Sequence, residues 1–269
     1  MIPKIIHYCW FGRKQKSELV KMCINSWRTF CPEYKILEWN EDNFDLTFNC
    51  FIQEAYAAEK WAFVTDFVRL HVLYEYGGIY MDTDTELIKN LDLFLQDNAF
   101  IGYETAKTIS TSLIGAMKGN VWIRHCMSYY EERHFFLSDG HINDITNVEI
   151  ITAEITVFYN INLDGKLRHL EDITLYPKRF FCPKNALSGR IDIMPDTYAI
   201  HHFDGSWLSS EEKEKKKRLE KYRKYFGWWL GLQIAEFGIE YEKKGVQGLT
   251  ELFKTKFTDK FLKGMKENN

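Results

Sequence analysis

The apolar residues in the first third of the chain alternate between the spacing of strands and the spacing of helices. Continuous apolar runs at Lys4–Trp10, Tyr34–Trp39 and Ile79–Met81 predict buried strands. Helical spacing connects them, first over residues 19–30, before Pro32, and then over residues 52–76, where a break is expected. Strand, helix, strand, helix, strand predicts an α/β fold whose first strands are parallel.

The pattern is weaker in the rest of the chain. Short strands are expected at Ala99–Tyr103 and Leu113–Met117, a helix from about Val121 to Phe136, and an extended segment at Asp192–Ile200. From Glu211 to Lys224 eight Lys or Arg and four Glu follow one another, and Trp228 and Trp229 come soon after. We therefore predict a catalytic domain over residues 1–210 and a helical C-terminal extension over residues 211–269.

Composition narrows the class of protein. The chain has 269 residues, 45% of them apolar and 27% charged, as in soluble globular proteins. A net charge of −3 argues against a nucleic-acid partner. The six cysteines form no C-x-x-C pair, which is typical of reduced thiols. We find neither a secretory leader nor an apolar membrane span, and we expect a cytoplasmic protein.

The segment Gly77–Asp84, with the sequence GGIYMDTD, is the main candidate for chemistry. Asp82 and Asp84 follow an apolar strand, and the alternation of a strand would put both side chains on one face. Adjacent carboxylates repel each other unless a cation lies between them, and Mg²⁺ or Mn²⁺ takes such oxygen ligands. A bare D-x-D pattern is more often a solvated turn, so the neighbouring residues have to decide.

A second polar pair lies on the preceding helix. Asp66 and Arg69 are three residues apart and therefore share a helix face. In a pocket, a carboxylate and a guanidinium together can hold sugar hydroxyl groups. The alternative is an ordinary ion pair on the helix surface.

Four ordered motifs together resemble a known family. They are Ile2–Gly12 (IPKIIHYCWFG), Ser26-Trp27 with Pro32–Tyr34 and Trp39-Asn40, Trp61–Asp84 (Trp61 with TDFVR and YGGIYMDTD), and His201–Trp207 (HHFDGSW). This combination is similar to the DXD-containing sugar transferases, which include bacterial capsular polysaccharide transferases, fungal initiating mannosyltransferases and the core of the large clostridial glucosylating toxins. The similarity is dense over roughly the first hundred residues and returns only in the last motif.

The resemblance implies a GT-A-type, Rossmann-like mixed sheet that binds a nucleotide sugar. It implies a metal-dependent glycosyltransferase that uses Mn²⁺ or Mg²⁺ and a UDP-linked donor, retains the anomeric configuration, and acts in bacterial capsule or surface polysaccharide synthesis. The acceptor would be a glycan or a lipid-linked oligosaccharide. The implied roles are catalysis for Asp66, Arg69, Asp82 and Asp84, donor binding for Trp10, Asp66, Arg69, Tyr80, Asp82, Ser206 and Trp207, and metal binding for Asp82, Asp84, His202 and His201.

Some of these roles stay open at the level of sequence. His201 and His202 follow an extended run, so only one should face the cleft; counting back from Trp207 slightly favours His202. Trp10 would stack on the nucleotide base, but it could equally be a core aromatic. Glu154 is a weak candidate for the acceptor site.

Two alternatives to a transferase remain for the chain as a whole. Asp82-Thr83-Asp84-Thr85 also fits the first motif of haloacid-dehalogenase phosphohydrolases, with Asp82 as nucleophile, although the later acidic motif of that class is missing. A non-catalytic sugar-nucleotide binder is the other alternative to a transferase.

The basic C-terminal segment could lie on the inner face of the cell membrane, bind a second subunit, or form a solvated helical cap.

Overall fold

The computed structural model describes residues 1–205 apart from 144 and 187, together with the separate positions 218, 219, 222, 238, 245 and 247. The chain divides into two compact units, residues 1–184 with 191–207, and residues 185–190 with 208–269. Every element discussed below belongs to the first unit. Apart from these six positions, the C-terminal extension, with its expected membrane contact, lies outside the described residues, and the boundary at residue 210 stays a prediction. Within the described part of the chain we find no helix that is both long enough and apolar enough to cross a bilayer.

The first unit contains a mixed sheet with helices on both sides. Its elements are β1 (Ile5–Cys9), α1 (Glu18–Phe30), β2 (Lys35–Trp39), α2 (Cys50–Ala57), α3 (Trp61–Tyr76), β3 (Gly78–Met81), β4 (Thr85–Leu87), η1 (Asp92–Gln96), β5 (Ala99–Tyr103), β6 (Ile109–Ala116), α4 (Val121–Ser128), α5 (Asn147–Phe158), β7 (Arg168–His169), β8 (Thr174–Tyr176), η2 (Lys178–Phe180) and β9 (Ala199–His201).

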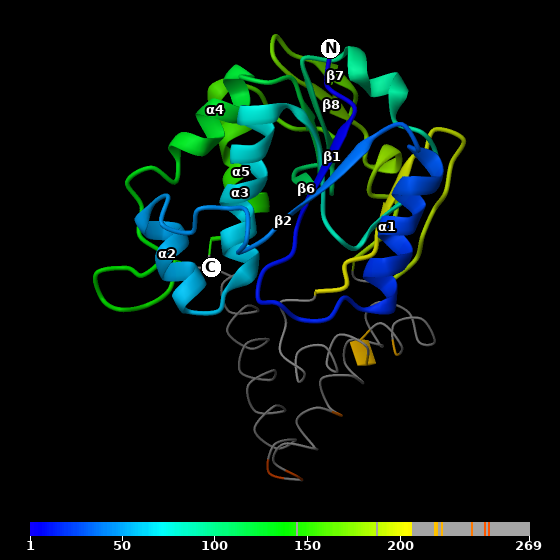
Figure 1. Ribbon diagram of the computed structural model, residues 1–269. Helices are drawn as coiled ribbons and strands as arrows, with labels where there is room; N and C mark the ends of the chain where they lie inside the picture. Colours follow the sequence, from blue (N-terminus) through cyan, green and yellow to red (C-terminus); the bar gives the residue numbers. More distant parts are fainter. Residues whose placement is uncertain are drawn as a thin grey trace, which may run out of the picture. The chain divides into compact units, whose positions relative to one another are not determined.

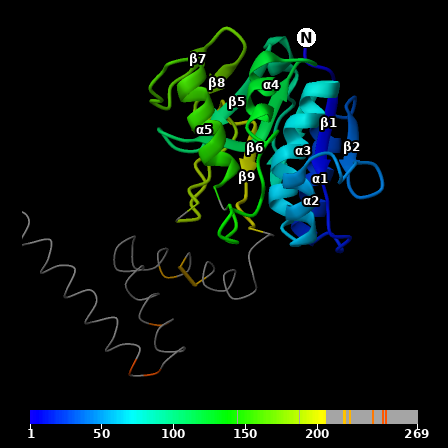
Figure 2. The same ribbon diagram turned by 90° about the vertical axis from the view of Figure 1, so that its left-hand side faces the viewer.

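The strand order of the large sheet is β2-β1-β3-β6-β5-β8-β7, and β4 and β9 form a separate antiparallel pair. Strand β1 is parallel to β2 and β3, as predicted, whereas β6 is antiparallel to β3 and β5. In Figure 1, α2 to α5 lie on the left of the sheet and α1 on its right. The view turned by 90° shows the covering helices α3, α4 and α5 from the front (Figure 2). The predicted mixed α/β sheet is therefore confirmed.

Local sequence explains why β3 begins where it does. Gly77 ends α3 with φ +66°, and a Cβ there would lie 2.6 Å from the Lys118 nitrogen. Gly78 has φ +110°, and a Cβ there would lie 2.7 Å from the Ile5 carbonyl oxygen. Only glycine fits both requirements. The glycine pair thus turns the chain from α3 directly into the strand that leads to Asp82.

Two predicted elements differ from the structure. The helix expected from Val121 to Phe136 ends at Ser128. The Glu54 carboxylate accepts hydrogen bonds from the backbone N–H groups of Phe135 and Phe136, so these donors are not available to a helix. Of the expected extended segment Asp192–Ile200, only its end is a strand, in β9. Helix α5 was not predicted, and we return to it below.

Candidate active site

The two acids of the D-x-D pattern follow β3 in a tight turn. The strand ends at Met81, and the Thr85 N–H donates to the Asp82 carbonyl at 2.9 Å. The Asp82 N–H donates to the Ser112 carbonyl at 2.8 Å, which ties the start of the turn to β6. The turn, rather than the alternation of a strand, therefore brings Asp82 and Asp84 together.

His201 completes a cluster with these acids. Single ligand atoms of Asp82, Asp84 and His201 all lie within 4.8 Å of one another. Strand β9 pairs with β4 so that His201 is opposite Thr85, next to the acidic turn. The His202 imidazole instead lies 2.9 Å from a Glu86 oxygen. The structure thus brings His201, and not His202, to the acids.

Asp84 is held firmly in this cluster. Its Oδ2 accepts from the Asp204 N–H at 2.7 Å, and its Oδ1 lies 3.4 Å from His201 Nε2. Burial acts against ionisation, but the His201 charge and these hydrogen bonds bring the pKa of Asp84 to about 2. Burial likewise opposes the charge on His201, while Asp84 raises the pKa of His201 to about 10.

The cluster fits a divalent ion by the chemistry of its donors. Two carboxylates and an imidazole are ligands that Mn²⁺ accepts, and Mg²⁺ takes the carboxylate oxygens. Asp82, Asp84 and His201 would hold such an ion. Within the described residues these three form the group that meets the spacing of a metal site.

Asp66 and Arg69 form a buried pair beside the acidic turn, not a surface ion pair. Arg69 Nη2 lies 2.9 Å from Asp66 Oδ1, and Nη1 donates to the Thr111 carbonyl at 2.8 Å. Nη1 also lies 3.4 Å from Asp82 Oδ1, and the guanidinium lies 4.7 Å from the centre of the Tyr80 ring. Arg69 therefore connects the helix pair to the D-x-D turn, as the sugar-binding hypothesis requires.

Charges in this buried group affect one another strongly. Burial raises the pKa of Asp66 to about 7, with Asp82 adding to the rise and Arg69 opposing it. Burial opposes the charge on Arg69, but Asp82 raises the pKa of this group above its ordinary value. The Tyr80 hydroxyl donates to Asp82 Oδ1 at 2.8 Å, so Tyr80 and Arg69 both orient Asp82.

Asn147 is a site residue that the sequence did not reveal. It is the first residue of α5, is 4% exposed, and donates through Nδ2 to the Tyr130 hydroxyl at 2.9 Å and the Asp66 carbonyl at 3.4 Å. Its Oδ1 is buried and has no hydrogen-bond partner among the described residues. The signal that could have located it is the capping box of Thr146 and Glu149, which starts α5.

Trp10 lies directly after β1, at the same edge of the sheet as Asp82. Its indole Nε1 donates to the Lys14 carbonyl at 2.6 Å, and the Lys16 ammonium lies 5.4 Å from the ring centre. The side chain is half-buried, so base stacking on Trp10 stays a prediction. Ser206 and Trp207, the expected phosphate-binding residues, lie outside the described residues.

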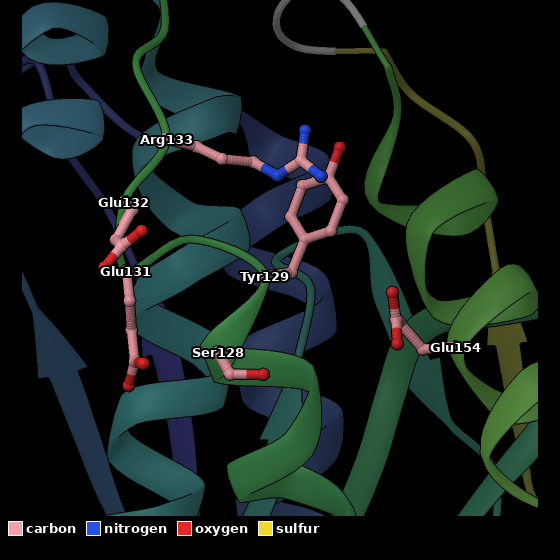
Figure 3. Close-up of a pocket in the computed structure, with 6 residues that line it drawn as sticks. All are labelled: Ser128, Tyr129, Glu131, Glu132, Arg133 and Glu154. Atoms are coloured by element: carbon pink, nitrogen blue, oxygen red, sulfur yellow. The ribbon is translucent and has the colours of Figure 1, made fainter.

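Glu154 lies away from this cluster, in an open hollow of about 440 Å³. The hollow is lined by Ser128, Tyr129, Glu131, Glu132, Arg133 and Glu154 (Figure 3). Arg133 covers the Tyr129 ring at 3.9 Å, and Glu154 Oε2 lies 2.6 Å from His125 Nε2. Glu154 thus pairs with α4, and the lining includes none of the D-x-D residues.

Comparison with known proteins finds glycosyltransferases. Residues 17–101 match the family described as "Glycosyltransferase sugar-binding region containing DXD motif". Inositol phosphoceramide mannosyltransferase 3 of Schizosaccharomyces pombe is 28% identical over 137 residues, which cover 45% of this chain and 35% of that protein. An uncharacterized glycosyltransferase of Acanthamoeba polyphaga mimivirus is 25% identical over 220 residues, covering 77% of this chain and 84% of that protein. The chain therefore spans about a third of the length of the yeast relative.

Solved structures of glycosyltransferases are also similar. The PaToxG glycosyltransferase is 19% identical, covers 59% of this chain and 70% of its own, and has a TM-score of 0.46. A glycosyltransferase involved in the glycosylation of the major capsid of PBCV-1 is 11% identical, covers 80% of this chain and 99% of its own, and has a TM-score of 0.47.

The matched segment contains α1, α3 and the D-x-D turn, and thus most of the cluster described above. The family favours a transferase over the phosphohydrolase alternative for Asp82. Residues 17–101 are thus similar to the sugar-binding region of the DXD-containing glycosyltransferases, and the relatives that match the chain are glycosyltransferases as well.

Proposed function

We propose that this protein transfers a sugar from a nucleotide-sugar donor, bound with a divalent ion, to a hydroxyl group of an acceptor. The observation that carries the proposal is the meeting of Asp82, Asp84 and His201 beside the buried pair of Asp66 and Arg69. A metal site and a polar sugar site in direct contact are what such a transfer needs.

A bound Mn²⁺ or Mg²⁺ would stabilise the negative charge that develops on the leaving diphosphate. The chain's own residues do the positioning. Asp84, which the Asp204 N–H already fixes, would be the direct ligand. Asp82, which Tyr80 and Arg69 orient, would contact the ion or the donor.

The donor sugar would lie against Asp66 and Arg69. The Asp66 carboxylate has one oxygen on Arg69 and can accept from sugar hydroxyl groups with the other, while the guanidinium donates. Both side chains are rigid because they are buried and hydrogen-bonded, so little ordering is lost when the sugar binds. Trp10 would stack on the nucleotide base, which the family resemblance predicts to be uracil.

We propose retention of configuration, with the acceptor hydroxyl attacking from the side of the leaving diphosphate. The yeast relative is named an inositol phosphoceramide mannosyltransferase, so mannose is a first donor sugar to test. A role in bacterial capsule synthesis stays a prediction, because the curated relatives come from a yeast and a virus.

A donor panel tests the proposal directly. The full chain is incubated with UDP- and GDP-linked sugars and Mn²⁺, and nucleotide release is measured with and without EDTA. We expect release from at least one donor, its loss with EDTA, and its loss in Asp84→Ala but not in Asp139→Ala, which removes an exposed carboxylate.

The same assay separates the alternatives. A phosphohydrolase would cleave p-nitrophenyl phosphate and require Asp82, whereas a binding protein would retain a nucleotide sugar without consuming it. Either result, or full activity of Asp84→Ala, would refute the transferase proposal.

A further inference from the structure

The end of β5 places a carboxylate at the active-site edge of the sheet. Strand β6 is antiparallel to both β3 and β5, so β3 and β5 run in the same direction and end at the same edge. Glu104 follows Tyr103, the last residue of β5, and its N–H continues the ladder by donating to the Thr108 carbonyl at 2.9 Å. Glu104 therefore lies at the edge that carries Asp82 and Trp10, two strands along from β3.

The direction of the Glu104 side chain follows from its neighbours. Alternate residues of a strand share a face, so Glu104 points to the same side as Gly102. A Cβ on Gly102 would lie 2.9 Å from the Phe181 ring, on the side of η2. Glu104 thus faces the side where η2 supplies Lys178.

Two positively charged side chains act on the Glu104 carboxylate. Burial raises the pKa of Glu104, and the positive charges of His201 and Lys178 act on it in the opposite direction. Glu104 and Lys178 are both half-buried. In the described part of the chain neither side chain forms a hydrogen bond or an ion pair that would occupy it. A carboxylate therefore lies near both an ammonium group and His201, and it is free to bind a ligand.

We propose that Glu104 and Lys178 form the subsite for the acceptor, and that this acceptor is a neutral sugar or polyol. The Glu104 carboxylate can accept hydrogen bonds from one or two hydroxyl groups of the acceptor, and the Lys178 ammonium group can donate to a neighbouring oxygen of the acceptor. The carboxylate and the ammonium group carry no net charge together, and a phosphate or an amine would be attracted by one of them and repelled by the other, so the pair suits an uncharged ligand. This inference rests on the proposed function, because it supplies the acceptor for the same transfer.

The position of the pair supports an acceptor role over a donor role. The donor-side residues Asp66 and Arg69 come from α3, on the opposite face of the sheet from Phe181. His201 is related to both groups, since its Nε2 lies 3.4 Å from Asp84 Oδ1 and its charge acts on Glu104. An acceptor held by Glu104 would thus approach the metal site from the face of the sheet opposite to α3.

The test separates transfer from hydrolysis. The full chain, with Mn²⁺ and the donor it consumes best, is assayed for nucleotide release in water and for transfer to a panel of methyl glycosides of common hexoses. We expect Glu104→Gln and Lys178→Gln each to lower kcat/KM for the glycoside about 10- to 100-fold, the usual effect of removing a charged hydrogen-bond partner. Hydrolysis and the KM for the donor should change less than about twofold. Glu171→Gln makes the same charge change in the turn before β8, and it should behave as wild type.

Each outcome decides a different point. Equal rates of transfer by Glu104→Gln and by the wild type overturn the subsite. A loss of donor hydrolysis as large as the loss of transfer also overturns it, because it would assign Glu104 to the donor site or the metal site. Donor consumption without transfer to any glycoside also overturns a neutral-sugar subsite and leaves the proposed function standing. No donor consumption by the wild type overturns the proposed function itself.

Discussion

The buried side chain of His7 should make the stability of the protein depend on pH, and it contacts the turn that leads into β3 and Asp82. His7, in β1, is 0% exposed. Its Nδ1 accepts from the Trp39 indole at 3.0 Å, so its Nε2 carries the proton and donates to the Gly77 carbonyl at 2.8 Å. Burial lowers the pKa of His7 from 6.5 to about 4, with the Gly77 carbonyl opposing this. The neutral ring thus fastens the turn that enters β3.

The sign and size of the effect follow from linkage. In the unfolded chain His7 is protonated with a pKa of about 6.5, whereas in the folded protein it is protonated with a pKa of about 4. Stability from neutral His7 is complete above pH 6.5 and is lost as the pH falls toward 4. A pKa difference of this size corresponds to about 3 kcal/mol in full, of which about 2 kcal/mol is lost between pH 7 and pH 5.

Urea denaturation of the full chain at pH 7 and pH 5 measures this loss. His7→Gln removes the titrating group, so its unfolding free energy should fall by about 2 kcal/mol less than that of the wild type over the same interval. The variant will be less stable at pH 7, because it replaces the imidazole that joins the Trp39 indole to the Gly77 carbonyl. Equal pH dependence of wild type and variant would refute the argument that His7 is buried neutral.

Three further substitutions test the site and the sheet. Mn²⁺ at about 100 times its Kd should stabilise the wild type by about 2.7 kcal/mol and raise its Tm. In Asp84→Asn the metal loses a charged ligand, so the same Mn²⁺ concentration should no longer raise the Tm. A Tm shift equal to that of the wild type would contradict the ligand assignment. Trp10→Ala should weaken donor binding by about 1–3 kcal/mol in calorimetry without changing the urea midpoint, and unchanged affinity would identify Trp10 as a packing residue. In Gly115→Ala the new Cβ would lie 2.0 Å from the Phe100 ring, so the unfolding free energy should fall by about 1–3 kcal/mol, which an unchanged urea midpoint would disprove.

The first half of the sheet could be predicted because local and tertiary requirements agree there. In α1, Ser17 caps the helix, and its apolar face of Val20, Cys23, Ile24 and Trp27 is the face that is buried. Strands β1 and β3 are buried on both sides because helices cover both faces of the sheet, whereas β2, at the edge, is only half-buried. Pattern and burial thus give the same answer, and β1, β2 and β3 lie where the sequence placed them.

Helix α5 could not be predicted because its composition favours a strand. The segment Asn147–Phe158 is rich in Ile, Val and Thr, which prefer extended structure. Tertiary burial of Ile150, Ile151 and Ile155 and the capping box at its start override that preference. The consequence for function is that Asn147, which α5 brings to Asp66, remained hidden.

The choice between His201 and His202 depended on strand register, which one sequence does not fix. Side chains alternate along a strand, so a shift of one residue exchanges the two histidines. Pairing with β4 sets the register, with His201 opposite Thr85 and the His202 N–H bonded to the Asp84 carbonyl at 2.9 Å. Long-range pairing, not local pattern, therefore decides which imidazole meets the acids.

The balance of charges in the cluster explains why a divalent ion, and not a lysine or arginine, is the expected partner of the D-x-D turn. Arg69 lies 2.9 Å from Asp66 and only 3.4 Å from Asp82, so its single charge is shared between two carboxylates. The negative charge of Asp84 is balanced by His201 only while the imidazole is protonated, and this imidazole must be neutral to act as a metal ligand. Asp82 and Asp84 then stand close together with little positive charge of their own, and two negative charges are what one Mn²⁺ or Mg²⁺ neutralises.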